Sequence, residues 1–234
     1  MNRYMWIVLI LGLVASCAEI DDVAQEKSLS SMYVSRPVQI DGNLQEWPAQ
    51  LDTLYLTDRE NLSDNVMIVK SVWSLANLYL AFQVSDFDLR AYQTELDHKK
   101  LFLDDMVEFL LDTQMDRSEK WLADDIIYHI NLQGQKKDDR GTALGESDPS
   151  WHGGAVYGVS LQGTLNDTTD SDQGYVVEVA VPWTEIGRKP KAGLEMGLNV
   201  ACGDNDGKGR MLFDWVNAWP TRSPDVFGTL VLER

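Results

Sequence analysis

Carboxylates are the most abundant groups in this sequence that could do chemistry. The 234 residues carry 37 acidic side chains, and short acidic runs occur at Asp204-Asn205-Asp206 before Gly207, at Asp104-Asp105 and at Asp86-Phe87-Asp88. Calcium prefers hard oxygen ligands in a flexible loop, although these runs lack the glutamate that completes an EF-hand. We expect Asp204, Asp206, Asp104 and Asp105 to be candidate calcium ligands, with solvated turns as the alternative.

Two glutamates could form a catalytic pair. Glu108 and Glu178 both fall on the non-core faces of predicted strands, and glycoside hydrolysis needs two carboxylates about 5 to 10 Å apart. Two acids among 37 are a weak signal, and the chain shows neither a nucleophile elbow nor a phosphate-binding loop. Hydrolysis by paired carboxylates therefore remains an alternative to binding.

The three histidines are widely separated in the sequence. His98, His129 and His152 have no spacing typical of a zinc motif, and no Cys-x-x-Cys-His run is present. The sequence therefore predicts no zinc site.

Strands must position these side chains, because apolar residues alternate with a period of two through most of the chain. In the clearest run, Gly174 to Gly187, Pro182 ends a strand and Trp183–Ile186 follows as one helical turn over the core. Similar patterns predict strands at Val38–Ile40, Asp52–Thr57, Val66–Trp73, Leu78–Ser85, Met106–Asp112, Ile126–Leu132, Val156–Leu165, Leu194–Val200, Arg210–Trp215 and Phe227–Leu232. Residues Asp138 to Gly153 read as a long loop.

Short strands without a periodic apolar helix favour an all-β fold. We expect an antiparallel two-sheet β-sandwich of jelly-roll or immunoglobulin-like type, with short helical turns. The strands at Val66–Trp73 and Leu78–Ser85 should form a hairpin, and so should Val156–Leu165 and Gly174–Pro182.

The N-terminus predicts export. A basic Arg3 and a short apolar run precede Val14-Ala15-Ser16-Cys17, which resembles a bacterial lipobox. The apolar run is shorter than the roughly 20 residues needed to span a bilayer. The expected organisation is a signal peptide at 1–16, a lipidated Cys17 opening a tether at 17–32, and one domain at 33–234. An ordinary signal peptide with a chance cysteine is the alternative.

Composition limits the partners. Twenty Lys and Arg against 37 Asp and Glu give a net charge of −17, which argues against nucleic acid because phosphate binding needs a basic surface. With Cys17 lipidated, Cys202 has no partner for a disulfide and reads as a small buried residue.

Six pieces, in order, resemble family 9 carbohydrate-binding modules and their DOMON-like relatives. They are Ile40-Asp41-Gly42 with Glu46-Trp47, WSLANLYLAFQVSD from Trp73, Asp105–Phe109, GYVVEVAVPWTEIG from Gly174, GLNVACGDND from Gly197, and Phe227–Leu230. The resemblance implies a β-sandwich with structural calcium and two tryptophans that clamp a terminal sugar unit.

By this resemblance, the two clamp tryptophans correspond to Trp73 and Trp215 in this sequence. An indole face can pack against the C–H face of a pyranose while hydroxyls bond around the rim. Trp73 also falls on the same side of its predicted strand as Met67 and Val69, so the alternative is that Trp73 is a core residue. The same alternative holds for Trp215. Trp219 is an independent exposed candidate.

Polar rim residues would give the sugar its identity. We expect Glu108, His129, Asn131, Glu178 and Asn199 in this role. His129 stands where the family tends to have an arginine, which puts the family's sugar preference in doubt here.

The expected function is non-catalytic binding of mono-, di- or polysaccharide ends by a calcium-stabilised lipoprotein. It would face the periplasm or the cell surface from the outer membrane of a Gram-negative bacterium and support glycan catabolism beside hydrolases or importers. The resemblance to DOMON-like domains implies another alternative, in which the domain binds haem through methionine and histidine ligands.

Overall fold

A computed structural model describes residues 27–207, 210–218 and 222–234. Within these ranges it contains thirteen strands, one short α-helix and three 3-10 turns. The strands are β1 (Ser28–Tyr33), β2 (Thr53–Thr57), β3 (Val66–Trp73), β4 (Asn77–Ser85), β5 (Met106–Asp112), β6 (Asp125–Asn131), β7 (Lys136–Gly141), β8 (Ser147–Asp148), β9 (Val156–Gln162), β10 (Gly174–Pro182), β11 (Glu195–Asp204), β12 (Met211–Asp214) and β13 (Gly228–Glu233). The helix is α1 (Trp183–Ile186), and the 3-10 turns are η1 (Leu44–Glu46), η2 (Leu101–Leu103) and η3 (Pro224–Val226).

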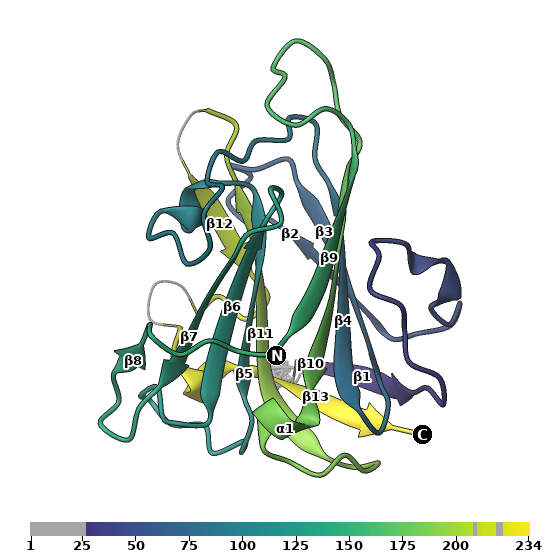
Figure 1. Cartoon of the computed structure of the whole chain (residues 1–234), viewed down its shortest axis with the longest axis vertical. Helices are drawn as coiled ribbons and strands as arrows, with labels where there is room; N and C mark the ends of the chain where they lie inside the picture. Colours follow the sequence, from purple (N-terminus) through teal and green to yellow (C-terminus); the bar gives the residue numbers. More distant parts are fainter. Residues whose placement is uncertain (1–26, 208–209, 219–221) are drawn as a thin grey trace, which may run out of the picture.

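The strands form one continuous sheet that curls until its two halves face each other (Figure 1). The order is β8-β7-β6-β5-β11-β13-β1-β3-β4-β10-β9, with β12 paired to β11 and β2 to β3. Most pairs are antiparallel, while β1 lies parallel to both β13 and β3 where the sheet turns from one half to the other. The predicted β-sandwich is confirmed, and the two predicted hairpins are the pairs β3–β4 and β9–β10.

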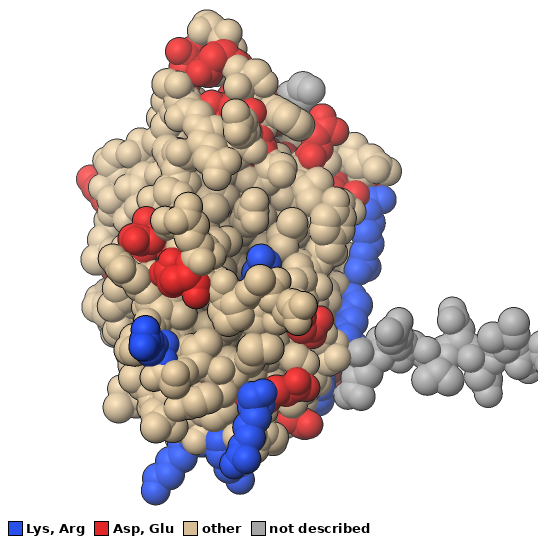
Figure 2. Space-filling view, turned by 90° about the vertical axis from the view of Figure 1, so that its right-hand side faces the viewer, with Lys and Arg blue, Asp and Glu red and all other residues tan. Residues whose placement is uncertain are grey.

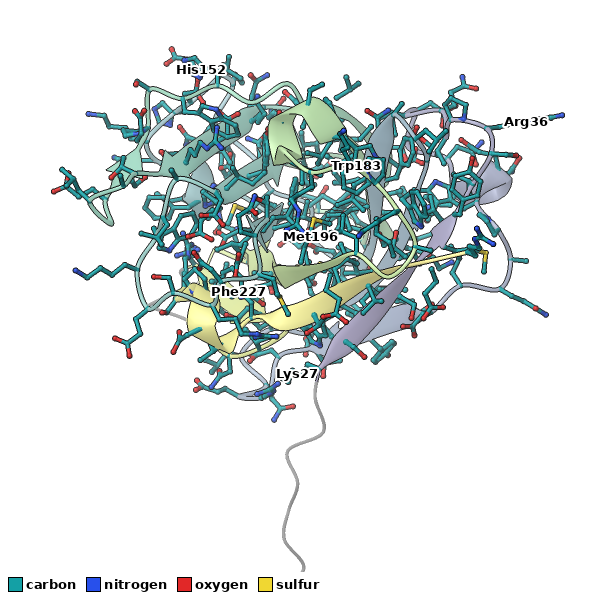
Figure 3. The ribbon with its side chains drawn as sticks, turned by 90° about the horizontal axis from the view of Figure 1, so that it is seen from below. Lys27, Arg36, His152, Trp183, Met196 and Phe227 are labelled. Atoms are coloured by element: carbon teal, nitrogen blue, oxygen red, sulfur yellow. The ribbon has the colours of Figure 1, made fainter. Side chains whose placement is uncertain are left out.

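The core lies between the two halves. Alternate residues of facing strands fill it, such as Val107 and Phe109 of β5 and Val177 and Val179 of β10. Pro182 ends β10 as expected, and α1 follows with Trp183 buried and its indole N–H donated to the Ser74 carbonyl at 2.8 Å. Figure 3 shows Trp183 and Met196 among the interior side chains, seen from below.

The first strand described begins before the domain boundary predicted at Tyr33. Residues 28–32 belong to β1, in which Leu29 and Ser31 are fully buried and the Ser71 hydroxyl donates to Ser31. The tether prediction was wrong for these residues, because a polar segment gains its structure by pairing with β13 and β3 rather than from its own apolar pattern.

The predicted loop at 138–153 contains most of β7 and all of β8, so that prediction was wrong in part. Charged residues such as Lys136 and Asp138 form β7 because they pair with β6 and bond each other. Conversely, Val38–Ile40 forms no strand.

The surface reflects the acidic composition. Figure 2 shows acidic side chains at the top of one face and scattered lower on it, with lysine and arginine side chains mostly toward its right and lower edges. In the described ranges, no helix has both the length and the apolar character needed to cross a membrane.

Candidate functional site

A row of polar side chains crosses the outer face of the sheet half that contains β5, β6, β11 and β12. Cross-strand pairing places His129 of β6 beside Glu108 of β5, Glu108 beside Ala201 of β11, and Ala201 beside Asp214 of β12. The flanking residues of β5 point into the core, so these side chains point away from it. We call Glu108, His129, Asp214 and Arg222 the polar row.

Glu108 is the centre of the polar row. Its Oε2 lies 2.8 Å from His129 Nε2 and 2.8 Å from Arg222 Nη2, and the carboxylate is 1% exposed. Burial alone would raise the pKa of Glu108, but His129 and the guanidiniums of Arg222 and Arg210 together hold that pKa below its ordinary value. Glu108 is therefore a fixed negative charge that orients two donors at its edge.

Asn199 lies on the same face but is engaged with the backbone. Its Nδ2 donates to Asp214 Oδ2 at 3.2 Å, and its Oδ1 accepts from the backbone N–H groups of Val200 and Val216 at 2.9 and 3.3 Å. Asn199 thus anchors the chain after β12, and the prediction that it contacts a ligand stays a prediction.

Two hollows lie at the ends of the polar row. The first has a volume of 220 Å³ and is lined by Trp121, Ile127, Asp139, Gly145, Ser147 and Arg222. The second, of 400 Å³, lies beside β12 and includes Arg210, Asp214, Asn217 and the segment from Thr57 to Glu60 in its lining. We call the first the Trp121 hollow.

The Trp121 hollow combines an aromatic wall with an unsatisfied acceptor. Trp121 is half-buried, and its indole N–H donates to the Arg222 carbonyl at 3.1 Å. Asp139 is 8% exposed; its Oδ2 pairs with Lys137, whereas its Oδ1 has no hydrogen-bond partner among the described residues. A buried acceptor of this kind is costly unless another molecule donates to it.

The two predicted clamp tryptophans do not form an open clamp. Trp73 is 4% exposed, belongs to the core, packs edge-on against Tyr33 and donates its indole N–H to the Glu233 carbonyl at 2.7 Å. Trp215 is 9% exposed, also belongs to the core and meets Gly228 at its ring edge. Trp73 points to the same side of its strand as the core residues Met67 and Val69. The structure therefore agrees with the alternative that Trp73 is a core residue. Trp219 lies outside the described residues.

Glu178 is a structural residue rather than part of a ligand rim. It is fully buried on the other half of the sheet, where Oε2 accepts the backbone N–H groups of Asp41, Gly42 and Asn43 and Oε1 accepts the indole N–H of Trp47 at 2.6 Å. Glu108 and Glu178 point outward from opposite halves, so the paired-carboxylate arrangement is not formed.

Asn131 and Asp104 hold each other. Asn131 Nδ2 donates to Asp104 Oδ2 at 2.8 Å and to the Gln93 carbonyl, while Asp104 also accepts the N–H groups of Tyr92 and Gln93. Both side chains fix the loop after Arg90. In the structure these polar atoms bond to the protein itself, so a ligand contact of Asn131 and a metal contact of Asp104 stay predictions.

Asp105, Asp204 and Asp206 come together with Asp86. Burial is the largest cause that raises the pKa of Asp105, Asp204 and Asp86, and repulsion by neighbouring carboxylates raises each pKa further. Asp204 is 1% exposed, and its Oδ1 has no hydrogen-bond partner within the described chain. A divalent cation would offset this charge, and we call these four residues the Asp204 cluster.

A second acidic cluster lies at the end of β5. Asp112, Asp124 and Asp125 each place an oxygen within 4.8 Å of the others, and Asp125 Oδ1 lacks a hydrogen-bond partner among the described residues. Burial, together with the charges of Asp124 and Asp112, raises the pKa of Asp125 to about 7. Sequence reasoning missed this cluster because Asp112 lies 12 residues before the adjacent pair Asp124 and Asp125.

Sequence reasoning also missed the ligand-facing candidates of the Trp121 hollow. Trp121 reads as structural in a charged connection, and Asp139, Ser147 and Arg222 sit in segments that show no motif. The available signal was strand parity, which predicted that Glu108 and His129 point away from the core; the register of the structure then places them side by side.

Comparison with known proteins gives consistent relatives. The model of the "Carbohydrate family 9 binding domain-like" family matches residues 40–234. The chain is 28% identical over 172 residues to Exoglucanase XynX of Acetivibrio thermocellus and 27% identical over 172 residues to Endo-1,4-beta-xylanase A of Thermoanaerobacterium saccharolyticum. Each match covers 71% of this chain but 12% and 11% of those proteins.

Solved structures share the fold. A family 9 carbohydrate-binding module from Caldicellulosiruptor kristjanssonii in complex with cellotriose has a TM-score of 0.69 at 22% identity, covering 88% of this chain and 94% of its own. A module from the same organism in complex with glucose has a TM-score of 0.67 at 23% identity, covering 89% and 97%. A putative carbohydrate-binding protein from Bacteroides uniformis has a TM-score of 0.66 at 15% identity, covering 89% and 100%. With the family match spanning most of its length, the chain belongs to the carbohydrate family 9 binding domain-like family.

Proposed function

We propose that this protein binds the end of a carbohydrate, without catalysis, in the Trp121 hollow. Membership of the family supports binding, and the related modules crystallised with glucose and cellotriose support a saccharide ligand. The observation that carries the location is the aromatic wall of Trp121 beside Asp139 Oδ1, which has no hydrogen-bond partner in the described part of the chain. A volume of 220 Å³ equals that of about seven waters at ~30 Å³ each, which suits one sugar ring.

The chemistry of the hollow matches a sugar. The Trp121 ring offers an apolar surface for C–H groups, and Asp139 Oδ1 accepts a hydroxyl proton. Arg222, oriented by Glu108, and the exposed hydroxyl of Ser147 supply donors at the rim. The larger hollow beside β12 is lined mainly by charged and aliphatic residues, with Phe213 buried, so it offers no comparable aromatic wall in its described lining.

The aromatic contact in this proposal is Trp121 rather than the pair Trp73 and Trp215. Both of those indoles are core side chains, so their loss should affect stability first. Trp219 remains a candidate for a second aromatic contact, on sequence grounds alone.

The test is calorimetric titration with glucose and cellotriose. Trp121→Ala and Asp139→Asn should each weaken binding about tenfold to hundredfold, since a bond to a charged group contributes roughly 1.5–3 kcal/mol. Asp170→Asn, the same change on an exposed loop between β9 and β10, should leave affinity unaltered. Circular dichroism confirms the fold of each variant. Equal affinity of all three variants would place the sugar elsewhere.

We propose that calcium occupies the Asp204 cluster. Three observations favour a bound cation: four carboxylates, the raised pKa values, and a buried Asp204 oxygen that has no hydrogen-bond partner among the residues described. Oxygen ligands favour calcium. If only the folded state binds calcium, calcium would stabilise the folded state by mass action.

Removal of calcium by EDTA should lower the melting temperature. The shift should disappear in Asp204→Asn, whereas Asp125→Asn, in the second acidic cluster, should keep it. A shift that vanishes only in Asp125→Asn would move the calcium to that cluster, and an unchanged melt of the wild type would exclude a structural ion.

We further propose that Cys17 carries a lipid, so that the domain is held at the outer membrane and presents glycan ends to neighbouring hydrolases or importers. The Val14–Cys17 sequence supports this, and Cys17 lies outside the described residues. Replacement of Cys17 by Ala should move the protein from the membrane fraction to the soluble fraction. Retention at the membrane would refute the lipid anchor.

A further inference from the structure

A histidine and two aspartates from three distant segments meet at the rim of the fold. Asp97, Asp138 and His152 each offer one ligand atom, and these atoms all lie within 4.8 Å of one another. His152 Nδ1 is 3.3 Å from Asp97 Oδ2 and 3.7 Å from Asp138 Oδ1. Figure 3 shows His152 at the outer edge, away from the core side chains.

These distances suit a shared ion better than hydrogen bonds. A charge-assisted N–H···O bond measures about 2.7–2.9 Å, which is shorter than either separation. Two ligands bound at about 2.0–2.1 Å to a tetrahedral zinc lie roughly 3.3 Å apart. The cluster therefore needs little contraction to enclose an ion.

Asp138 supplies a buried oxygen that accepts no hydrogen bond from the described residues. Its side chain is fully buried, and its Oδ2 accepts Lys136 Nζ at 2.8 Å and the Gly153 N–H at 2.7 Å. Its Oδ1 faces His152 and, within the ranges that the structure describes, makes no hydrogen bond. A carboxylate oxygen left in this state gains most from a bound cation or proton donor.

Backbone contacts fix the three segments relative to one another. The Asp97 N–H donates to the Lys136 carbonyl at 2.9 Å, which ties the segment of Asp97 to β7. Lys136 Nζ also donates to the Gly153 carbonyl at 2.8 Å, which ties the segment of His152 to the same strand. Lys136 thus positions Asp138 and the residue after His152 without occupying Asp138 Oδ1.

Charge and exposure indicate what the site would take. Two carboxylates against one ammonium leave a net charge of −1 while His152 is neutral, which favours a divalent cation. An imidazole nitrogen with two carboxylate oxygens suits a borderline ion such as zinc more than calcium, which prefers oxygen alone. His152 is 61% exposed, so a fourth position is open to solvent.

We propose that Asp97, Asp138 and His152 bind a divalent transition-metal ion of the zinc class, with three protein ligands and one solvent position. The ion would join the segments at residues 97 and 152 to β7. This site is separate from the Trp121 hollow and from the Asp204 cluster, so it stands independently of the proposed sugar and calcium binding.

The test is a zinc titration of the purified, EDTA-treated protein without a polyhistidine tag, in excess calcium to fill oxygen-rich sites. Wild type should bind one equivalent with a rise in melting temperature. His152→Ala and Asp138→Asn should weaken binding by at least the 10- to 100-fold that loss of a ligand-orienting residue costs. Cobalt in place of zinc should give a visible spectrum that His152→Ala abolishes.

His98→Ala is the matched control, because His98 neighbours Asp97 in sequence but lies outside the cluster. It should bind zinc as wild type does. Absence of saturable zinc binding by the wild type would overturn the proposal, and so would equal affinity of wild type and His152→Ala. Retained sugar binding in His152→Ala would show that this site and the Trp121 hollow are distinct.

Discussion

Replacement of Glu178 by glutamine tests whether this residue serves the fold or a ligand. The change keeps the shape of the side chain but turns one acceptor oxygen into an NH2 donor. In the wild type, Oε2 accepts three backbone N–H groups at 2.6–3.1 Å and Oε1 accepts the Trp47 indole N–H at 2.6 Å. Glutamine can satisfy the three backbone donors only if its NH2 faces the Trp47 N–H.

The magnitude follows from these four bonds. Loss of one bond to a charged acceptor costs roughly 1.5–3 kcal/mol, and a buried donor facing a donor adds to this. The remaining three bonds also weaken as the acceptor loses its charge. We expect the free energy of unfolding to fall by about 2–4 kcal/mol, a large part of the 5–15 kcal/mol typical of a domain.

Urea unfolding followed by tryptophan fluorescence measures this loss. The midpoint should fall while the slope stays the same. Glu46→Gln is the control, because Glu46 is an exposed glutamate of the same loop and should change stability little. Unchanged stability of Glu178→Gln with weakened sugar binding would refute the structural role and restore Glu178 to the ligand rim.

Three further outcomes follow from buried groups. Trp73→Ala should cost about 3–5 kcal/mol of stability, measured by urea unfolding, because a buried indole is lost, while the folded fraction binds sugar as before. The folded state lowers the pKa of Glu108, so its stabilisation is present above the ordinary value of 4.5 and lost as pH falls through the lower folded pKa; Glu108→Gln should therefore flatten the acid limb of the melting-temperature profile. Gly174→Ala should unfold the protein at lower temperature, because φ is +130° there and a Cβ would lie 1.9 Å from the Val84 carbonyl oxygen. Melts that match wild type would contradict each expectation.

The antiparallel strands of this fold could be predicted from sequence because each carries its own alternation. The pattern of β4 and β10 identifies both their core faces and their hairpin partners. The pattern fails at β1 and β7, where Ser, Lys and Asp occupy strand positions. Those segments are strands because neighbouring strands offer unpaired backbone groups and, for β7, because Lys136 and Asp138 neutralise each other.

The candidate site was predictable only where strand parity determines it. Parity placed Glu108 and His129 outward, and register then placed them side by side. Parity was also right for Glu178, yet an outward side chain on a sheet can be covered by a loop, as the Asp41–Asn43 turn covers this one. The Trp121 hollow and both carboxylate clusters depend on loops that converge from distant positions, and no local pattern encodes that convergence.

The parallel pairing of β1 with β13 joins the two ends of the described chain. Ser28 lies opposite Thr229, so partners that are adjacent in the sheet are 201 residues apart in the sequence. Closing so long a loop costs conformational entropy before the two strands can form their stabilising contacts, and topologies with such distant contacts fold slowly. The sheet cannot be completed until β13 has been synthesised, so β1 must wait for this partner strand while the intervening chain is made. A truncation of only β13 would then remove the strand that bridges β1 to β11, separating the two halves of the sandwich.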